Sequence, residues 1–274
     1  MVTCCDFAIG KNQPLFIIAG PCVVEDPALT FDIAAKLKEI TQDLHVNFVF
    51  KASVDKANRS SIDSFRGIGY EAGLNVLADI KKTLDIPVLT DIHTPDTVAE
   101  VASVVDILQI PAFLCRQTDL VVKAAETNLP VNIKKGQFLA PWDMEQVINK
   151  LCEKDLDINS NQIWITERGT SFGYNTLVVD FRSLPQLKNF GCPVIFDATH
   201  SVQQPGGQGE TSGGQREFVE HLARAAVAVG VAGVFIETHQ DPDNAPSDGP
   251  NMVPLNKLEN LLKQLNDIDN LIKS

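Results

Sequence analysis

Pro193-Val194-Ile195-Phe196-Asp197 is the stretch of this chain that decides its fold. An unbroken apolar run ends here in a carboxylate, His200 follows three residues later, and a loop rich in glycine leads to Gly214. Such a run, without alternation of polar and apolar residues, is typical of a parallel strand that is buried on both faces. The polar residues that follow it therefore predict a site at the carboxyl end of a strand.

The same pattern recurs along the chain, where short apolar runs alternate with amphipathic stretches. This alternation predicts a parallel sheet covered by helices. Strands are expected at residues 15–18, 47–51, 87–91, 106–110, 131–134, 162–166, 193–197 and 233–237. Helices are expected at about residues 27–43, 70–84, 95–103, 116–127, 142–153, 183–190, 215–229 and 257–273. Eight strands alternating with helices are what a closed (β/α)8 TIM barrel requires.

The length of 274 residues suits one such barrel, and a hydrophobic content of 44% is enough for a large core. No linker rich in proline or serine, block of charge or low-complexity tract divides the chain. We therefore expect residues 1–14 to form an N-terminal extension that caps the bottom of the barrel. Residues 15–274 are expected to form a single catalytic barrel.

The acidic character of the chain limits its partners. A formal net charge of -12 would repel a nucleic-acid backbone or an anionic membrane surface. Residues 1–25 do not have the pattern of a signal peptide, and no apolar run is long enough to span a membrane. The six cysteines contain no C-x-x-C pair. We expect a cytoplasmic protein without nucleic-acid or membrane partners.

Basic residues end several of the predicted strands or follow them closely. In a barrel, the carboxyl ends of the strands meet at one mouth, so these side chains are expected to converge there. Lysine and arginine bind phosphate well, and several of them suggest more than one anionic group. Surface ion pairs are the alternative interpretation. The basic set is Lys51, Lys56, Arg59, Arg116, Lys134 and Arg168.

A second set of residues, three from strand ends and one from a loop, could bind a metal. Cys22, His200, Glu237 and Asp248 offer one thiolate, one imidazole and two carboxylates. Because sulfur is a soft ligand, such a set would favour a divalent ion such as iron, zinc or manganese over magnesium. The spacing of these residues leaves the alternatives open, since Cys22 could be a buried inert thiol and His200 a structural residue.

Two glycine patterns resemble nucleotide-binding loops but do not fit. Residues 67–73 and 207–213 both miss G-x-G-x-x-G by one position, and neither directly follows a predicted strand. This argues against an NAD-dependent dehydrogenase. The loop from Gly206 to Gly214 is interpreted instead as a lid that excludes water once substrate is bound.

Longer motifs resemble those of one family. Residues 48–61 (FVFKASVDKANRSS), 109–119 (QIPAFLCRQTD), 132–138 (NIKKGQF) and 167–169 (ERG) with 172–174 (FGY) resemble the 3-deoxy-D-manno-octulosonate 8-phosphate synthase family. The resemblance runs from about Phe16 to the C-terminal helix. It implies a (β/α)8 barrel, usually a homotetramer, that condenses phosphoenolpyruvate with D-arabinose 5-phosphate and water. The reaction releases inorganic phosphate and serves the biosynthesis of Kdo and lipopolysaccharide.

The resemblance also implies roles for individual residues. The phosphoenolpyruvate carboxylate and phosphate would be held by Lys56, Lys134 and Arg168, with Gln109 and the Ala112 backbone beside them. The pentose phosphate would be held by Asn58, Arg59 and Ser60, with Arg116 reaching in from a neighbouring subunit. The pocket would be lined by Lys51, Ser53, Asp91 and Phe113. Lys134, His200 and Asp248 are the residues expected to take part directly in catalysis.

One position divides the family into two classes. Metal-dependent members have Cys where metal-independent members have Asn, and this chain has Cys22 there. The resemblance therefore implies a divalent metal ion held by Cys22, His200, Glu237 and Asp248, which would orient the aldehyde or a water as a Lewis acid.

Two other functions remain as alternatives. A related synthase makes 3-deoxy-D-arabino-heptulosonate 7-phosphate from erythrose 4-phosphate. It carries Lys-Pro-Arg-Thr/Ser where this chain has Lys56-Ala57-Asn58-Arg59-Ser60. A non-catalytic barrel that binds sugar phosphates is the second alternative, and it would bind both substrates without releasing phosphate.

Overall fold

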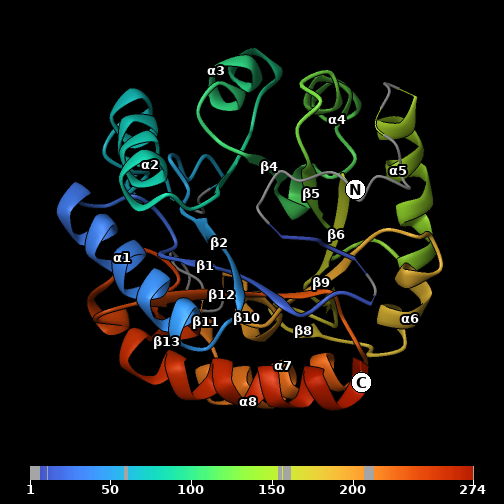
Figure 1. The fold of residues 1–274 in the computed structure, drawn as a ribbon. Helices are drawn as coiled ribbons and strands as arrows, with labels where there is room; N and C mark the ends of the chain where they lie inside the picture. The colour runs from blue at the N-terminus through green and yellow to red at the C-terminus, as the bar shows by residue number, and fades with distance from the viewer. Residues whose placement is uncertain are drawn as a thin grey trace.

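Eight parallel strands form the centre of the fold in the computed structural model, which describes residues 7–10, 12–58, 61–153, 156, 162–206 and 213–273. The strands close into a barrel because β1 pairs with both β2 and β12 (Figure 1). They are β1 (Phe16–Gly20), β2 (Asn47–Lys51), β3 (Val88–Asp91), β4 (Ile107–Ile110), β5 (Val131–Lys134), β6 (Ile163–Glu167), β9 (Val194–Asp197) and β12 (Gly233–His239). The predicted (β/α)8 TIM barrel is confirmed.

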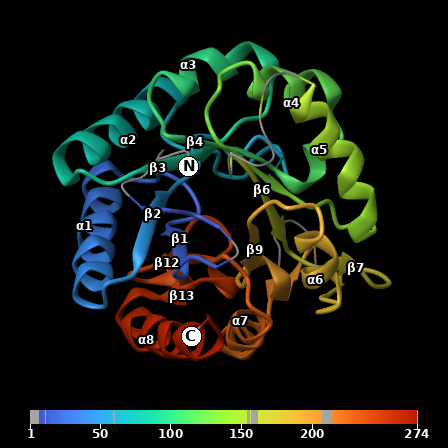
Figure 2. The ribbon, with the colours of Figure 1, turned by 45° about the vertical axis from the view of Figure 1, so that its right-hand side comes forward.

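Helices surround the strands in chain order, as Figure 2 shows. They are α1 (Pro27–Asp43), α2 (Tyr70–Leu84), α3 (Val98–Ala102), α4 (Thr118–Ala125), α5 (Met144–Cys152), α6 (Ser183–Lys188), α7 (Val219–Ala228) and α8 (Leu255–Lys273). α1 begins where it does because the Asp26 carboxylate accepts a hydrogen bond from the Leu29 N–H and Pro27 occupies the first turn. No described helix is long and apolar enough to cross a membrane.

Short strands and single 3-10 turns occupy the loops. The strands are β7 (Thr170–Ser171), β8 (Leu177–Val178), β10 (Gln203–Gln204), β11 (Gly213–Gly214) and β13 (Val253–Pro254). The 3-10 turns cover Pro95–Thr97, Ala112–Leu114, Pro141–Asp143, His200–Val202, Arg216–Phe218, Pro242–Asn244 and Gly249–Asn251. β7 pairs with β8 and β10 pairs with β11, each pair antiparallel, while β13 extends the barrel sheet beside the end of β12.

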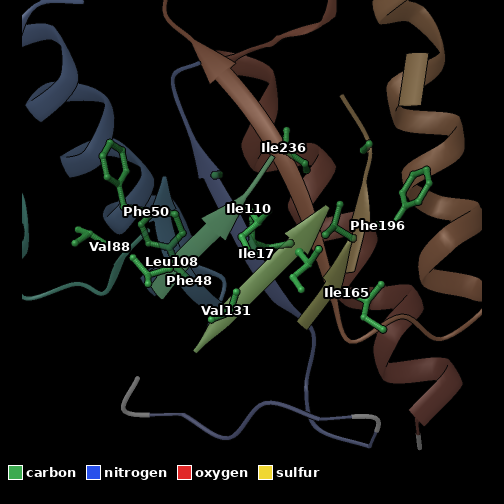
Figure 3. Packing of buried hydrophobic residues seen from close by; sticks show 14 of the residues in the cluster. Ile17, Phe48, Phe50, Val88, Leu108, Ile110, Val131, Ile165, Phe196 and Ile236 are labelled. Atoms are coloured by element: carbon green, nitrogen blue, oxygen red, sulfur yellow. The ribbon is translucent and has the colours of Figure 1, made fainter. Parts of the chain in front are cut away.

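The apolar core lies on both faces of the barrel sheet. Outward side chains such as Ile17, Phe48 and Leu108 pack in the cluster shown in Figure 3, which also contains the inner faces of the helices. Inward side chains such as Phe16 and Trp164 fill the barrel, with ring centroids 5.3 Å apart. Because both faces are buried, the strands read as continuous apolar runs.

The amino end of the barrel is closed by residues before β1. Phe7 and Ile9 pack with the inner cluster, and the ring centroids of Phe7 and Phe16 are 6.3 Å apart. The division of the chain into an extension of residues 1–14 and one catalytic barrel of residues 15–274 stays a prediction.

Candidate active site

A cavity of about 520 Å³ opens at the carboxyl ends of the barrel strands. Its walls come from the ends of β2, β3, β4, β5, β6, β9 and β12 and from the loops that follow them. Thirteen of the predicted site residues line it. They are Lys51, Ser53, Lys56, Asn58, Asp91, Gln109, Ala112, Phe113, Lys134, Arg168, His200, Glu237 and Asp248.

Two other described residues of the predicted site are placed differently. Cys22 is buried beside the cavity, next to Asp248. Arg116 is exposed and lies outside the cavity lining. Its predicted contribution to a neighbouring subunit stays a prediction. Arg59 and Ser60, and residues 207–212 of the predicted lid, lie outside the described residues.

Lys134 and Arg168 are buried neighbours at the ends of β5 and β6. Lys134 Nζ contacts the Asp197 carboxylate and lies 3.4 Å from the centroid of the Phe235 ring. Burial lowers the pKa of Lys134 to about 8, although Asp197 opposes this shift. Burial also lowers the pKa of Arg168, whose Nη2 donates to Gln203 Oε1 at 2.7 Å. Two cations therefore stand together inside one cavity.

Lys51 and Lys56 supply positive charge on the β2 side. Lys51 Nζ donates to Glu237 Oε1 and to the Cys22 carbonyl, each at 3.0 Å. Burial opposes the charge of Lys56, but the nearby Cys22 and Glu237 outweigh it and raise the pKa of Lys56. The acidic groups on this side of the cavity therefore stabilise the cations beside them.

The polar groups around β3 are only partly paired. His93 Nε2 lies 3.1 Å from Asp91 Oδ2. Asp91 Oδ1 and Ser53 Oγ are buried and have no hydrogen-bond partner among the described residues. Because unpaired buried polar atoms are costly, such atoms at a cavity indicate that a ligand with hydroxyl groups could satisfy them.

Three of the four predicted metal ligands form a cluster. One ligand atom from each of Cys22, Glu237 and Asp248 lies within 4.8 Å of the others. Cys22 Sγ is 3.1 Å from Asp248 Oδ2 and 2.9 Å from Ser247 Oγ. Burial, and after it the charge of Glu237, raises the pKa of the Cys22 thiol. A bound cation would reverse this effect, since a coordinated thiol loses its proton.

His200 lies beside this cluster and is oriented by Asp197. Its Nδ1 is 2.8 Å from Asp197 Oδ2, while its backbone N–H donates to Asp197 Oδ1 at 2.9 Å. Burial opposes the ionisation of Asp197, but His200 and Lys134 outweigh it and lower its pKa. An ionised Asp197 accepts a hydrogen bond from Nδ1–H, which leaves the lone pair of a neutral ring on Nε2.

The other side of the His200 ring provides a test of the metal hypothesis. Nε2 lies 3.5 Å from Glu237 Oε2, which is buried and has no hydrogen-bond partner among the described residues. A neutral Nε2 and a carboxylate oxygen are both acceptors, so they do not bond to each other. Two acceptors that face each other next to Cys22 and Asp248 suit a shared cation, and the residues therefore fit a divalent metal ion.

Sequence reasoning missed Asp197, Gln203 and Ser247 as site residues. Asp197 was visible as the carboxylate that ends the decisive strand, three residues before His200. Its position predicted a place at the barrel mouth but did not reveal its contacts with Lys134 and His200. Gln203 and Ser247 carry no sequence signal that distinguishes them from other loop residues.

Comparisons with known proteins agree over almost the whole chain. The family model for the DAHP synthetase I family matches residues 2–274. A 2-dehydro-3-deoxyphosphooctonate aldolase from Brucella anthropi is 62% identical over 263 residues, which cover 96% of this chain and 94% of the relative. Proteins of the same name from Nitrosococcus oceani and Thiobacillus denitrificans are 58% and 59% identical, and each alignment covers 98% of this chain and 95% of the relative.

Proposed function

This chain belongs to the DAHP synthetase I family, and we propose that its cavity is the active site of an octulosonate phosphate synthase. The enzyme is a transferase that condenses phosphoenolpyruvate with D-arabinose 5-phosphate and water in Kdo biosynthesis. The products are 3-deoxy-D-manno-octulosonate 8-phosphate and inorganic phosphate. The relatives are named for the eight-carbon acid, which sets the seven-carbon alternative aside.

The observation that carries the assignment of the site is the pair of buried cations at adjacent strand ends. Lys134 and Arg168 lie in one cavity, and each is held by an acceptor of its own, Asp197 and Gln203. Such a pair suits the carboxylate and the phosphate of phosphoenolpyruvate. Lys56 would add a third positive charge, with Gln109 and the Ala112 backbone beside it.

The acceptor would occupy the β2 and β3 side of the cavity. Ser53 and Asp91 offer buried polar atoms there that could pair with the hydroxyl groups of the pentose phosphate. Asn58 lines the same cavity, and Arg59 and Ser60 follow it in the sequence. One cavity would thus hold, next to each other, two anions that repel each other in water.

The reaction requires C3 of phosphoenolpyruvate to attack the aldehyde carbon while water adds at C2. The C2–O bond then breaks and phosphate leaves. The cations of the site would stabilise the charge that moves onto the departing phosphate, because a preorganised cation in a water-poor cavity loses little energy to reorganisation. Lys134 and Arg168 would serve this purpose directly.

The proposed metal site consists of Cys22, His200, Glu237 and Asp248. A divalent ion such as iron, zinc or manganese would act there as a Lewis acid toward the aldehyde or a water. Asp197 orients the His200 ring, and Lys51 neutralises part of the charge of Glu237. His200 and Asp248 would also be placed to hold or transfer a proton at the reacting centre.

The expected assembly is a homotetramer in which Arg116 completes the site of a neighbour. Supporting this, aromatic side chains are exposed on the loops after β4, β5 and β6, the first of which also carries Arg116. They are Phe113, Phe138, Trp142 and Phe172, and each is more than half exposed. Apolar groups gathered in this way on one side of a barrel mouth are typical of a subunit interface. The assembly and the cytoplasmic location stay predictions.

The decisive experiment measures phosphate release with two acceptors. Purified protein is incubated with phosphoenolpyruvate and either D-arabinose 5-phosphate or erythrose 4-phosphate, with and without divalent metal. Release with the five-carbon acceptor alone is expected. Release with only the four-carbon acceptor would contradict the proposal, and tight binding of both substrates without release would favour a non-catalytic barrel.

A further inference from the structure

One side chain connects a residue of the proposed phosphoenolpyruvate site with a residue of the proposed metal site. Gln203 lies on β10, directly after the 3-10 turn that carries His200. Its Oε1 accepts a hydrogen bond from Arg168 Nη2 at 2.7 Å, and its Nε2 donates to Asp248 Oδ1 at 2.8 Å. Gln203 thus contacts a cation proposed to bind substrate and a carboxylate proposed to bind metal.

The chemistry of the two partners requires a side chain that both accepts and donates hydrogen bonds at this position. A guanidinium can only donate hydrogen bonds, and an ionised carboxylate can only accept them. The glutamine amide carries both an acceptor and a donor, so it satisfies both partners in one orientation. A glutamate here would face Asp248 with like charge, and a lysine would face Arg168 with like charge.

The backbone around Gln203 fixes this bridge. Gln203 pairs with Gly214 across the β10–β11 hairpin. A side chain on Gly214 would collide with Asn251, because its Cβ would lie 1.5 Å from Asn251 Oδ1. The Arg216 guanidinium donates to the Gly249 carbonyl at 2.5 Å. The hairpin therefore packs directly against the turn that contains Asp248.

We propose that Gln203 is a positioning residue that orients the substrate cation Arg168 and the metal ligand Asp248 at the same time. The proposal rests on the proposed function of both partners. Because Gln203 occupies Asp248 Oδ1, the second oxygen, Oδ2, is left facing Cys22. Because it also binds Arg168 Nη2, it fixes the guanidinium beside Lys134 in the cavity.

The test replaces the amide with an apolar side chain of similar length. In Gln203→Met, both hydrogen bonds are lost. The matched control is Gln204→Met, the next residue on the same strand, which is not among the described residues that line the cavity. Binding of Mn²⁺ to chelator-treated protein and binding of phosphoenolpyruvate to Mn²⁺-loaded protein are measured by titration calorimetry, without the aldose phosphate.

We expect Gln203→Met to weaken Mn²⁺ binding by roughly tenfold, as is usual when a group that orients a metal ligand is removed. We expect phosphoenolpyruvate binding to weaken by about fivefold to tenfold, the size of one typical lost hydrogen bond. The control should change neither constant by more than about twofold, a shift worth less than one such bond. Thermal unfolding of the metal-free proteins reports any general loss of stability.

The outcomes separate the proposals. Unchanged constants in Gln203→Met would overturn the role of Gln203, and a change in only one constant would show that it serves one partner rather than bridging both. The proposed function is tested independently by phosphate release from the unaltered protein. A wild-type protein that binds both probes but releases no phosphate would refute the function and leave the result on Gln203 standing.

Discussion

Asp197 contacts two side chains of the candidate site at once, although no sequence motif marks it as a catalytic group. It contacts both Lys134 Nζ and His200 Nδ1 and is fully buried. Removing its charge should therefore affect the proposed substrate-binding cation and the proposed metal ligand together. A buried lysine without its counterion gives up its proton more easily.

We predict that kcat/KM for phosphoenolpyruvate falls as pH rises through about 8, the pKa of Lys134. The sign follows because the cation exists below this pKa and is lost above it, and kcat/KM reports ionisations of the free enzyme. Asp197→Asn should shift this alkaline limb to lower pH, since Asp197 raises the pKa of Lys134. A pH profile measured at saturating metal and fixed acceptor checks both statements. A limb that stays in place or moves to higher pH in the variant would contradict them.

Cys22→Asn should remove the soft ligand while preserving a polar side chain of similar size. We expect the metal content of the purified protein to fall to a small fraction of one ion per chain, because amide oxygen binds such ions much more weakly than thiolate. Metal analysis alongside phosphate release provides the measurement. Cys192→Ala is the control, since Cys192 is also buried but is not among the described residues that line the cavity. Equal metal content in all three proteins would refute the proposed ligand set.

Among the helices, α8 is attached to the residue that precedes β1 through one buried carboxylate. Asp269 Oδ2 accepts a hydrogen bond from the Leu15 N–H at 2.8 Å, and Oδ1 lies 2.7 Å from Lys273 Nζ. Asp269→Ala should lower the free energy of unfolding by about 2–4 kcal/mol, because a buried amide and an ammonium lose their partner.

The same helix offers a control for this stability prediction. Asp267 forms an i,i+4 pair with Lys263, and both side chains are more than 60% exposed. Asp267→Ala should change the free energy of unfolding by no more than about 0.5 kcal/mol. Urea unfolding of both variants at one fixed protein concentration makes the comparison. A similar loss in both variants would show that Asp269 does not fasten α8 to β1.

The sequence predicts most of these elements because parallel strands buried on both faces leave continuous apolar runs. The predicted β2 (47–51), β5 (131–134), α1 (27–43) and α2 (70–84) coincide with the observed bounds. The prediction fails where contacts with other parts of the fold determine where an element begins or ends. β12 continues to His239 because β13 pairs with its last two residues, and α8 begins at Leu255 rather than 257. The two loop hairpins were not predicted, because a strand of two residues is too short to show an alternating pattern of polar and apolar side chains.

The candidate site could likewise be predicted only in part. Lys134 and Lys135 look equivalent in the sequence, but strand alternation sends the first into the cavity. Lys135 is instead fully buried away from the cavity lining, where it donates to the Leu139 carbonyl and lies 3.5 Å from Glu167. Residue type and strand position could therefore be predicted. The hydrogen bonds of Gln203 and Asp197 could not, because they join segments that only the folded chain brings together.

The predicted shared site can be tested on the whole molecule. Arg116→Ala and Lys134→Ala should each be nearly inactive alone, because each lacks a cation for one substrate. If Arg116 serves a neighbour, mixed oligomers contain some sites with both side chains intact. Dissociating and reassembling an equal mixture should then recover roughly a quarter of the wild-type rate, as random pairing of two subunit types implies for closed homo-oligomers. Activity that stays at the level of the separate variants would place Arg116 in its own subunit's site or outside any site.

The seam where β1 meets β12 joins the two ends of the chain, and Cys22 and Asp248 stand on either side of it. A nascent polypeptide carries the thiol early but lacks the carboxylate until nearly all of the protein has been made. Binding of the metal ion would therefore require a closed barrel. Once bound, the ion would stabilise the closed barrel, since anything that binds only the folded form stabilises it. A partly synthesised or C-terminally clipped molecule would be left both unloaded and open.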